Sequence, residues 1–312
     1  MRVALVGPGD REEIRRLAIR LEERGGEALI LDSRCHPEIR LAKGTETACG
    51  QDLSGLRAVY VADLGIPKPF VKGPDGSLDL AASALALAAS RRHLVVWNTL
   101  LARLAAQCAV VNPPHTHDLH ALKPWEIATY HRLDLPAPVT LATSAPVSLT
   151  RPHLRAIAAW IRKGLVGGHG YTEAFELPQT VEKGESLFAG GPLMIQERIE
   201  GDNVRAFVLD GTVIGAAEVL QAGGETDSRR GEARIRRITL PDEAARLAVA
   251  AARHWGLLFT AVDFMRVTRS GSYFILECNS APFFVNFEKL TGIEISARLA
   301  EYLLRGQRAV AR

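Results

Sequence analysis

The sequence predicts an α/β chain in which a small parallel sheet is followed by antiparallel α+β subdomains. Three observations support this fold class. Strands alternate with a helix over residues 1–66, as in βαβ units. Residues 201–220 alternate in polarity on both sides of Asp210-Gly211, a dipeptide typical of hairpin turns. Two apolar runs, at 261–264 and 275–280, carry oxygen-bearing side chains that a buried strand normally excludes.

The N-terminal region is predicted to run strand, helix, strand, strand. The helix is expected to begin at the N-cap Asp10, with Glu13 in the capping-box position, and to end at Gly25-Gly26. An apolar stripe at helical spacing supports it. The expected strands are residues 3–6, 28–31 and 56–62.

The turn Gly7-Pro8-Gly9-Asp10 is similar to the start of a dinucleotide-binding fingerprint. Glu12 stands where the third glycine of that fingerprint belongs. We therefore interpret the segment as an ordinary strand-to-helix turn, which disfavours an NAD-dependent oxidoreductase.

The remaining elements are predicted from periodicity and proline positions. Residues 136–150 begin a second domain, and residues 157–162 fit a strand or a helix equally well. The expected elements are a helix at 78–106 interrupted near 93–98, a short strand at 110–111 closed by prolines, and helices at 118–133, 242–255 and 294–304. The expected domains are an N-terminal α/β domain at 1–114, an α+β subdomain at 115–190 and a second one at 191–312.

The composition argues against several classes of protein. The net charge of +3 implies no strong attraction to nucleic acid or to a membrane surface. No apolar stretch reaches the roughly 18 residues that a membrane-spanning helix needs. The four cysteines show no paired spacing, which favours a reducing cytoplasm over a disulfide framework or a zinc site.

The two C-terminal apolar runs predict a hairpin with one polar face. Glu277 and Asn279 are two residues apart and face the same way on a strand, whereas Cys278 faces the core. A three-residue loop at 269–271, with glycine at its left-handed last position, would place Asp263 opposite Glu277.

Two carboxylates and an amide on one face are hard oxygen donors that suit Mg²⁺. We therefore predict a metal site made of Asp263, Glu277 and Asn279. The alternative is an ordinary amphipathic hairpin whose carboxylates point to solvent. The many apolar residues of both runs leave little polar face and disfavour it.

Three weaker signals point to an anionic ligand. Lys163 precedes a glycine-rich stretch, Gly164–Gly170, whose amides could cover phosphate oxygens, although such a cluster is more often only a turn. The strand 193–199 opens into polar residues, where backbone groups could contact an adenine edge. Arginines at 205 and between 229 and 237 match carboxylate and phosphate geometry, although most such runs are solvated.

In this order, these segments resemble the ATP-grasp superfamily, specifically the RimK-type carboxylate–amine ligases. The resemblance extends from the first strand to the last helix and lies in the ordered set rather than in one motif. That set is Asn112-Pro113 with Lys123, Lys163 with its glycines, Gln196–Ile199, Asn203-Val204-Arg205, Asp263 with Glu277-x-Asn279, and Phe287–Ile295. Asn203 departs from the family's usual aspartate.

The resemblance implies an ATP-grasp fold, in which a βαβ pre-ATP-grasp domain precedes two α+β subdomains that enclose the nucleotide. It implies ATP as cofactor, with Mg²⁺ or Mn²⁺ on Asp263, Glu277 and Asn279. The nucleotide contacts that it implies are Lys123, Lys163, Gly167, Gly168, Gly170, Gln196, Glu197, Arg198, Ile199, Asn203 and Arg205. The catalytic side chains that it implies are Arg205, Lys163 and Arg236, with Arg234 as the alternative to Arg236.

The implied activity is ATP-dependent amide formation through an acyl phosphate, adding glutamate or another amino acid to a small-molecule or protein carboxylate. One alternative is a peptide maturase that forms side-chain amide or ester crosslinks in a ribosomal precursor peptide. Another is a non-catalytic ATP-binding protein, against which the complete set of lysines and metal ligands argues. By analogy alone we expect a homo-oligomer. The cysteines and the charge, as above, lead us to expect a cytoplasmic protein without nucleic-acid or membrane partners.

Overall fold

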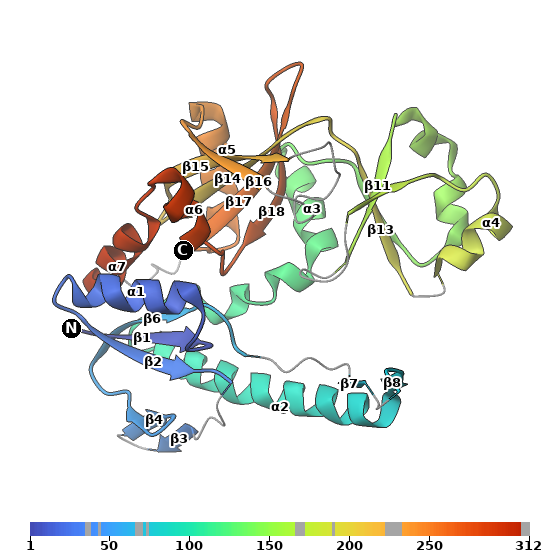
Figure 1. Cartoon of the computed structure of the whole chain (residues 1–312). Helices are drawn as coiled ribbons and strands as arrows, with labels where there is room; N and C mark the ends of the chain where they lie inside the picture. The colour runs from blue at the N-terminus through green and yellow to red at the C-terminus, as the bar shows by residue number, and fades with distance from the viewer. Residues whose placement is uncertain are drawn as a thin grey trace.

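The computed structural model describes residues 1–34, 39–42, 45–65, 71–72, 75–165, 172–188, 191–221 and 233–306. Figure 1 shows a parallel sheet at the lower left, a large antiparallel sheet above it, and a small antiparallel sheet at the right. The predicted α/β class, with a parallel start and antiparallel subdomains, is confirmed.

The parallel sheet has the strand order β2-β1-β6-β9, and every neighbouring pair is parallel. Helix α1 (Glu12–Glu22) packs on one face and helix α2 (Leu80–Ala105) on the other, because alternate strand residues enter two different apolar clusters. The strands are β1 (Arg2–Gly7), β2 (Glu27–Asp32), β6 (Leu56–Val61) and β9 (Ala109–Val111).

Two helix predictions in this domain are wrong. Arg11, not Asp10, is the N-cap of α1, and it makes no side-chain capping bond. Asp10 instead pairs with Arg34 at 2.9 Å. The expected interruption near residues 93–98 is absent from α2, because Trp97 and the leucines after it continue one buried face against the sheet.

Two small antiparallel sheets of this domain were not predicted. Their strands are short and lack a clear apolar alternation. They are β3 (Ile39–Ala42), β4 (Thr45–Ala48) and β5 (Gln51–Asp52), and the hairpin β7 (Val71–Lys72) and β8 (Leu78–Asp79).

The small antiparallel sheet has the strand order β10-β13-β11-β12. The ambiguous segment near residue 160 is therefore a strand, and Trp160 is buried in its core. The elements are β10 (Thr140–Thr143), β11 (Trp160–Lys163), β12 (Glu173–Phe175), β13 (Leu193–Glu197) and α4 (Val181–Glu185), with short 3-10 turns at Pro146–Thr150, Pro152–Ala156 and Ser186–Phe188.

The large antiparallel sheet has the strand order β16-β15-β14-β17-β18. One face packs against α3 and α5, and the other packs against α6 and α7 and shares their core with the parallel sheet. Its strands are β14 (Gly201–Leu209), β15 (Thr212–Gln221), β16 (Ala233–Ile238), β17 (Phe259–Val267) and β18 (Tyr273–Asn279). The helices are α3 (Lys123–Arg132), α5 (Asp242–His254), α6 (Val285–Thr291) and α7 (Ile295–Arg305), and 3-10 turns at Pro114–Thr116 and Leu119–Ala121 precede α3.

The arrangement departs from the domain ranges expected from the chain. Strand β13 pairs with β10 and β11, so the small sheet extends past residue 190. Helix α3 packs on the large sheet, although it precedes the small sheet in the chain. These packing partners depend on tertiary contacts that periodicity does not report.

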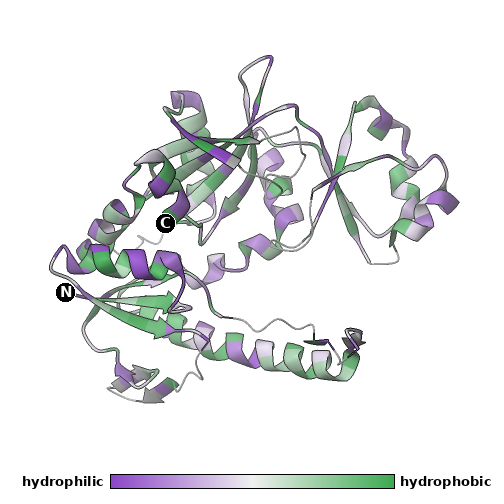
Figure 2. Cartoon of the chain, viewed as in Figure 1, coloured by the Kyte–Doolittle hydropathy of each residue, from purple (hydrophilic) through white to green (hydrophobic). Residues whose placement is uncertain are grey.

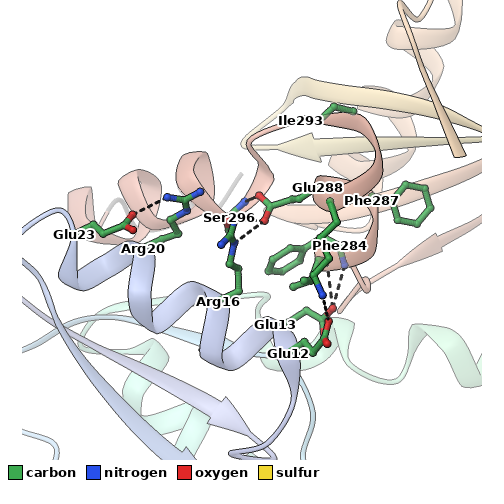
Figure 3. A network of polar contacts seen from close by, with 12 residues as sticks. Glu12, Glu13, Arg16, Arg20, Glu23, Phe284, Phe287, Glu288, Ile293 and Ser296 are labelled. Atoms are coloured by element: carbon green, nitrogen blue, oxygen red, sulfur yellow. Dashed lines mark hydrogen bonds and ion pairs between the residues drawn. The ribbon is translucent and has the colours of Figure 1, made fainter.

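A buried polar network joins α1 to α6 and α7 (Figure 3). The Glu13 carboxylate accepts hydrogen bonds from the backbone amides of Phe284, at 3.3 Å, and Val285, at 3.5 Å. Glu288 accepts from Arg16 at 3.2 Å and from both the amide and the hydroxyl of Ser296. The network fixes the parallel domain against the large sheet.

Glu288→Ala is expected to lower the free energy of unfolding by about 2–4 kcal/mol. The substitution leaves the buried amide and hydroxyl donors of Ser296 without a hydrogen-bond acceptor and removes the ion-pair partner of Arg16. Chemical denaturation measures the change. Glu301→Ala is the matched control, because its pair with Arg24 is exposed and is expected to contribute less than about 1 kcal/mol. Equal losses in both variants would contradict a structural role for the network.

Candidate active site

The large sheet aligns two carboxylates and two arginines in one row. Asp263 lies opposite Glu277 on one side and opposite Arg205 on the other. Arg205 lies opposite Ala217, which in turn pairs with Arg237. Residues directly opposite each other in a sheet share a face. The row therefore runs Glu277, Asp263, Arg205, Ala217 and Arg237, with two adjacent carboxylates at one end and two arginines after them, on the face that carries Asn279.

The predicted pairing of Asp263 with Glu277 is confirmed, but the predicted three-residue loop is wrong. Val267 donates its amide to Ser272, so the loop has four residues, 268–271, and Gly271 takes the left-handed conformation with φ 73°. The register then shifts by one residue between Asp263 and Phe264. This β-bulge offsets the longer loop and keeps the two carboxylates opposite each other.

Arg205 and Asp263 form a bidentate ion pair. The guanidinium Nε and a terminal nitrogen donate to the two carboxylate oxygens at 2.6 and 2.7 Å. Asp263 also accepts from the amide nitrogen of Asn279 at 2.9 Å. Burial alone would lower the pKa of Arg205, but the Asp263 carboxylate outweighs it and raises the pKa. Two strands and the end of a third are thus held together by charge-assisted bonds.

Two lysines approach the same carboxylates from outside the sheet. Lys123 begins α3 and places its ammonium 2.7 Å from Glu277. Lys163, at the end of β11 in the small sheet, places its ammonium 3.4 Å from the side-chain oxygen of Gln196. Burial lowers the pKa of Lys163, and the Glu277 carboxylate opposes this. The site therefore lies between the small and large sheets.

Glu277 is ionised in this setting. Burial alone would raise its pKa, but Lys123 and Lys163 outweigh that effect and hold the pKa below its ordinary value. Two lysines, one arginine and two carboxylates converge here, so an incoming polyanion would meet cationic groups from three different elements.

The donor set fits a hard divalent cation. Asp263 and Glu277 offer carboxylate oxygens, and the Asn279 amide nitrogen is engaged by Asp263, which leaves its Oδ1 as the oxygen to offer a cation. Among the described residues no group of three His, Cys, Asp or Glu side chains is placed to hold a metal, so this amide would be an essential member of the set.

Glu126 is a residue of the site region that sequence reasoning missed. It lies on α3 one turn after Lys123 and is 1% exposed. Its Oε1 accepts from the Cys278 backbone amide and from the Tyr130 hydroxyl, each at 2.6 Å. Cys278 lies between Glu277 and Asn279, so Glu126 anchors the strand that carries both. Cys278 itself is buried, as predicted, and burial raises the pKa of its thiol.

Glu126→Gln is expected to flatten the pH dependence of stability. Burial raises the pKa of Glu126 to about 8, so at pH values between its ordinary pKa and that value the folded state holds a proton that the unfolded state has released. Wild-type stability therefore falls as pH rises through this window, by a few kcal/mol. Glutamine keeps the acceptor oxygen without titrating.

Denaturation of both proteins across this pH range measures the effect. Glu126→Ala is the companion variant: it loses both hydrogen bonds and is expected to be destabilised at every pH. A Gln variant whose stability declines with pH as steeply as the wild type would contradict the assignment.

The remaining residues expected to contact the nucleotide lie at the end of β13, on β14 and outside the described residues. Glu197 and Ile199 are half-buried at the end of β13, and the Arg198 amide donates to Ala159. Asn203 lies on β14 two residues before Arg205 and therefore on the same face. Gly167, Gly168 and Gly170 lie outside the described residues, as do Arg229 and Arg230.

Arg236 does not lie where its expected catalytic role requires. It pairs with Glu218, one position out of register with the row of Arg205, and bonds the Glu218 carboxylate at 3.0 Å. Its side chain is therefore on the α5 face, opposite the carboxylate row, as is that of Arg234. Arg237 is the arginine of β16 that shares the face of Asp263. The sequence of β16 has no clear alternation of polar and apolar residues, so it does not predict which face each arginine takes.

Comparisons with known proteins show similarity to ATP-grasp ligases. Residues 177–303 match the family model of the RimK-like ATP-grasp domain. A relative described as probable alpha-L-glutamate ligase 1, from Shewanella sp. (strain MR-4), is 27% identical over 308 residues, which cover 93% of this chain and 90% of the relative.

Solved structures align over nearly the whole chain. The ATP-grasp ligase PsnB complexed with a minimal precursor superposes with a TM-score of 0.81 at 27% identity and covers 98% of this chain and 99% of its own. PsnB with minimal precursor, Mg and ADP has a TM-score of 0.78 at 28% identity, with 97% and 96% coverage. Within the described part of the present chain, no helix is long and apolar enough to span a membrane.

Proposed function

Because this chain belongs to the ATP-grasp superfamily and is a RimK-type ATP-dependent ligase, we propose that it joins a carboxylate to an amine through an acyl phosphate. The observation that carries the proposal is that Lys123 and Arg205 contact the carboxylates of Glu277 and Asp263, and that the charge of Lys163 helps to lower the pKa of Glu277. Three cations and an oxygen-donor set on facing sheets suit the phosphates of ATP and their metal.

The protein's contribution to such a reaction is to position the substrates and to neutralise the negative charge of the phosphates. Lys163 from the small sheet and Lys123 from α3 would contact phosphate oxygens, and Arg205 would face the reacting carboxylate or the phosphate that it attacks. Asp263, Glu277 and Asn279 would hold Mg²⁺ or Mn²⁺, which when bound neutralises phosphate charge. The glycine-rich segment after Lys163 would exclude water, which otherwise hydrolyses the acyl phosphate.

The proposed chemistry has two balanced steps. A substrate carboxylate oxygen attacks the γ-phosphorus, and the bond from that phosphorus to the ADP oxygen breaks. The amine nitrogen then attacks the acyl carbon, the carbon–oxygen bond to phosphate breaks, and the amine loses a proton. No side chain of the protein becomes covalently attached, in agreement with the buried position of Cys278.

Two substrate classes are supported by different observations. Addition of glutamate or another amino acid to a small-molecule or protein carboxylate is supported by the relatives described as glutamate ligases. Side-chain crosslinking of a precursor peptide is supported by full-length similarity to PsnB, whose structures contain its precursor. Arg237, exposed on the site face, would suit a carboxylate-bearing substrate in either case.

The test is an ADP-release screen with MgATP across amino acids, carboxylate acceptors and acidic peptides, followed by mass analysis. Amino-acid ligation adds the mass of one residue per turnover, whereas an internal crosslink removes one water. ATP binding without ADP release in the presence of any acceptor would overturn the proposal in favour of a non-catalytic ATP-binding protein.

A further inference from the structure

A hollow beside helix α7 is large enough to hold a small molecule. Its volume is about 460 Å³, which is within the range of small-ligand sites. It lies between α7, Arg24 just after α1, and the β14–β15 hairpin around Asp210. Figure 1 shows α7 beside α1 at the left of the large sheet, and Figure 2 colours both helices in purple and green, as expected for helices with one charged and one apolar face.

The hollow is separate from the candidate active site. Leu209 lines it and follows Arg205 by four residues on β14, which corresponds to roughly 14 Å along a strand. Phe207 projects from the same face between them, and its ring packs against Phe287 with the centroids 5.3 Å apart. A molecule bound in the hollow would therefore not occupy the site of the carboxylate row.

Most charged groups of the hollow are not paired with one another. In the described part of the chain, the one ion pair between lining residues joins Arg24 to Glu301, at 3.3 Å. Charges of both signs that face one hollow suit a ligand that itself carries both signs. Within the same described ranges, the lining residues left without an ionic partner are the cations Arg298 and Arg305 and the anions Asp210 and Glu294.

Tyr302 is a buried polar residue of the hollow whose hydroxyl is unpartnered. It is 2% exposed, and its hydroxyl makes no hydrogen bond with any residue that the structure describes. Burial raises the pKa of Tyr302 to about 12; the Asp210 carboxylate adds to this rise, and the Arg305 guanidinium opposes it. One charge of each sign thus acts on this hydroxyl. A buried hydroxyl without a partner is costly, so a polar ligand group beside it would be favourable.

We propose that the hollow binds a free amino acid as a zwitterion, with its ammonium group toward Asp210 and its carboxylate toward Arg305, beside the Tyr302 hydroxyl. The planar guanidinium matches the geometry of a carboxylate. Leu209 and Ile214 form an apolar wall for the side chain of the ligand. This site is additional to the proposed ligase site and does not depend on the ligase activity.

Isothermal calorimetry of the full-length chain without nucleotide, against each free amino acid in turn, tests the binding. At least one amino acid is expected to bind with a dissociation constant in the micromolar to millimolar range. Its N-acetyl derivative lacks the positive charge and its methyl ester lacks the negative charge, so each is expected to bind at least about tenfold more weakly. No binding by any amino acid at millimolar concentration, or undiminished binding of either derivative, would overturn the proposal.

Variants of the chain locate the bound amino acid. Asp210→Asn and Arg305→Gln each remove one exposed charge and are expected to weaken binding more than about tenfold. Asparagine tolerates the positive φ of 48° at position 210, so the turn is kept. Arg269→Gln is the matched control, because Arg269 is exposed but lies outside the hollow, and it is expected to bind like the wild type.

Glu277→Gln separates this site from the ligase site, because it alters the carboxylate row and leaves the hollow unchanged. It is expected to bind the amino acid with the affinity of the wild type. Binding that survives both Asp210→Asn and Arg305→Gln but is lost in Glu277→Gln would assign the amino acid to the ligase site and overturn the proposal. Calorimetry without nucleotide requires no turnover, so its result is independent of whether the chain releases ADP.

Discussion

Glu277→Gln is expected to reduce the maximal rate of ADP release roughly a hundred- to a thousandfold while the fold stays intact. Glu277 is one of two carboxylates in the proposed metal set, and it also balances Lys123 at 2.7 Å. Glutamine keeps the size of the side chain but removes the charge, so both the cation and the lysine lose their partner. Initial rates at saturating ATP and rising Mg²⁺ measure the loss.

Glutamine is preferred to alanine here, and asparagine is preferred at Asp263, for a structural reason. Asp263→Ala would leave the half-buried Arg205 guanidinium without its bidentate partner, and breaking such a pair destabilises a protein by a few kcal/mol. Loss of activity would then be confounded with loss of fold. Glu243→Gln, an exposed change on α5, is the matched control and is expected to keep full turnover. Full turnover in Glu277→Gln would contradict the assignment of Glu277 as a metal ligand.

The hairpin shows how sequence reasoning can reach a correct pairing through a partly wrong intermediate. The glycine at 271 does take the left-handed conformation, and Asp263 does face Glu277. However, the loop is one residue longer than predicted, and a bulge compensates. Bulges leave little trace in a sequence, because the extra residue, here Leu276, is as apolar as its neighbours. The apolar alternation predicts which residues share a face more reliably than it predicts turn geometry.

The errors have a common cause in tertiary packing. The predicted interruption near residues 93–98 does not occur, because Trp97 and the leucines that follow it continue the same buried face and keep α2 intact. Glu126 has the sequence context of a surface residue, and it becomes a buried anchor only because α3 crosses behind β18. In each case, the deciding contact joins residues far apart in the chain.

The same limit applies to the arginines of β16. In Arg234-Ile235-Arg236-Arg237-Ile238 the two isoleucines have opposite parity, so the alternation does not assign a face. Pairing with β15 decides it: Arg236 meets Glu218, and Arg237 meets Ala217 in the row of Arg205 and Asp263. Register relative to a neighbouring strand thus determines which arginine lies on the face of the carboxylate row.

Lys163→Met is expected to raise the dissociation constant of a non-hydrolysable ATP analogue by about ten- to a hundredfold, because a partly buried ammonium aimed at phosphate contributes a strong charge-assisted contact. In the wild type, burial lowers the pKa of this ammonium, so its charge is lost at a lower pH than that of an ordinary lysine. Binding of the analogue should therefore weaken as pH rises into the alkaline range. Isothermal calorimetry across that range measures the decline.

Two variants separate this titration from a general alkaline effect. Lys163→Arg keeps a permanent charge and is expected to remove most of the alkaline decline in binding. Glu277→Gln removes a carboxylate that supports the lysine's charge, so it should move the decline to lower pH. The two substitutions are thus expected to change the alkaline decline in binding in opposite directions, and they lie on different sheets. A merely local disturbance would not produce both changes. Identical pH profiles in all three proteins would exclude Lys163 as a phosphate contact, because its ionisation would then have no influence on the bound anion.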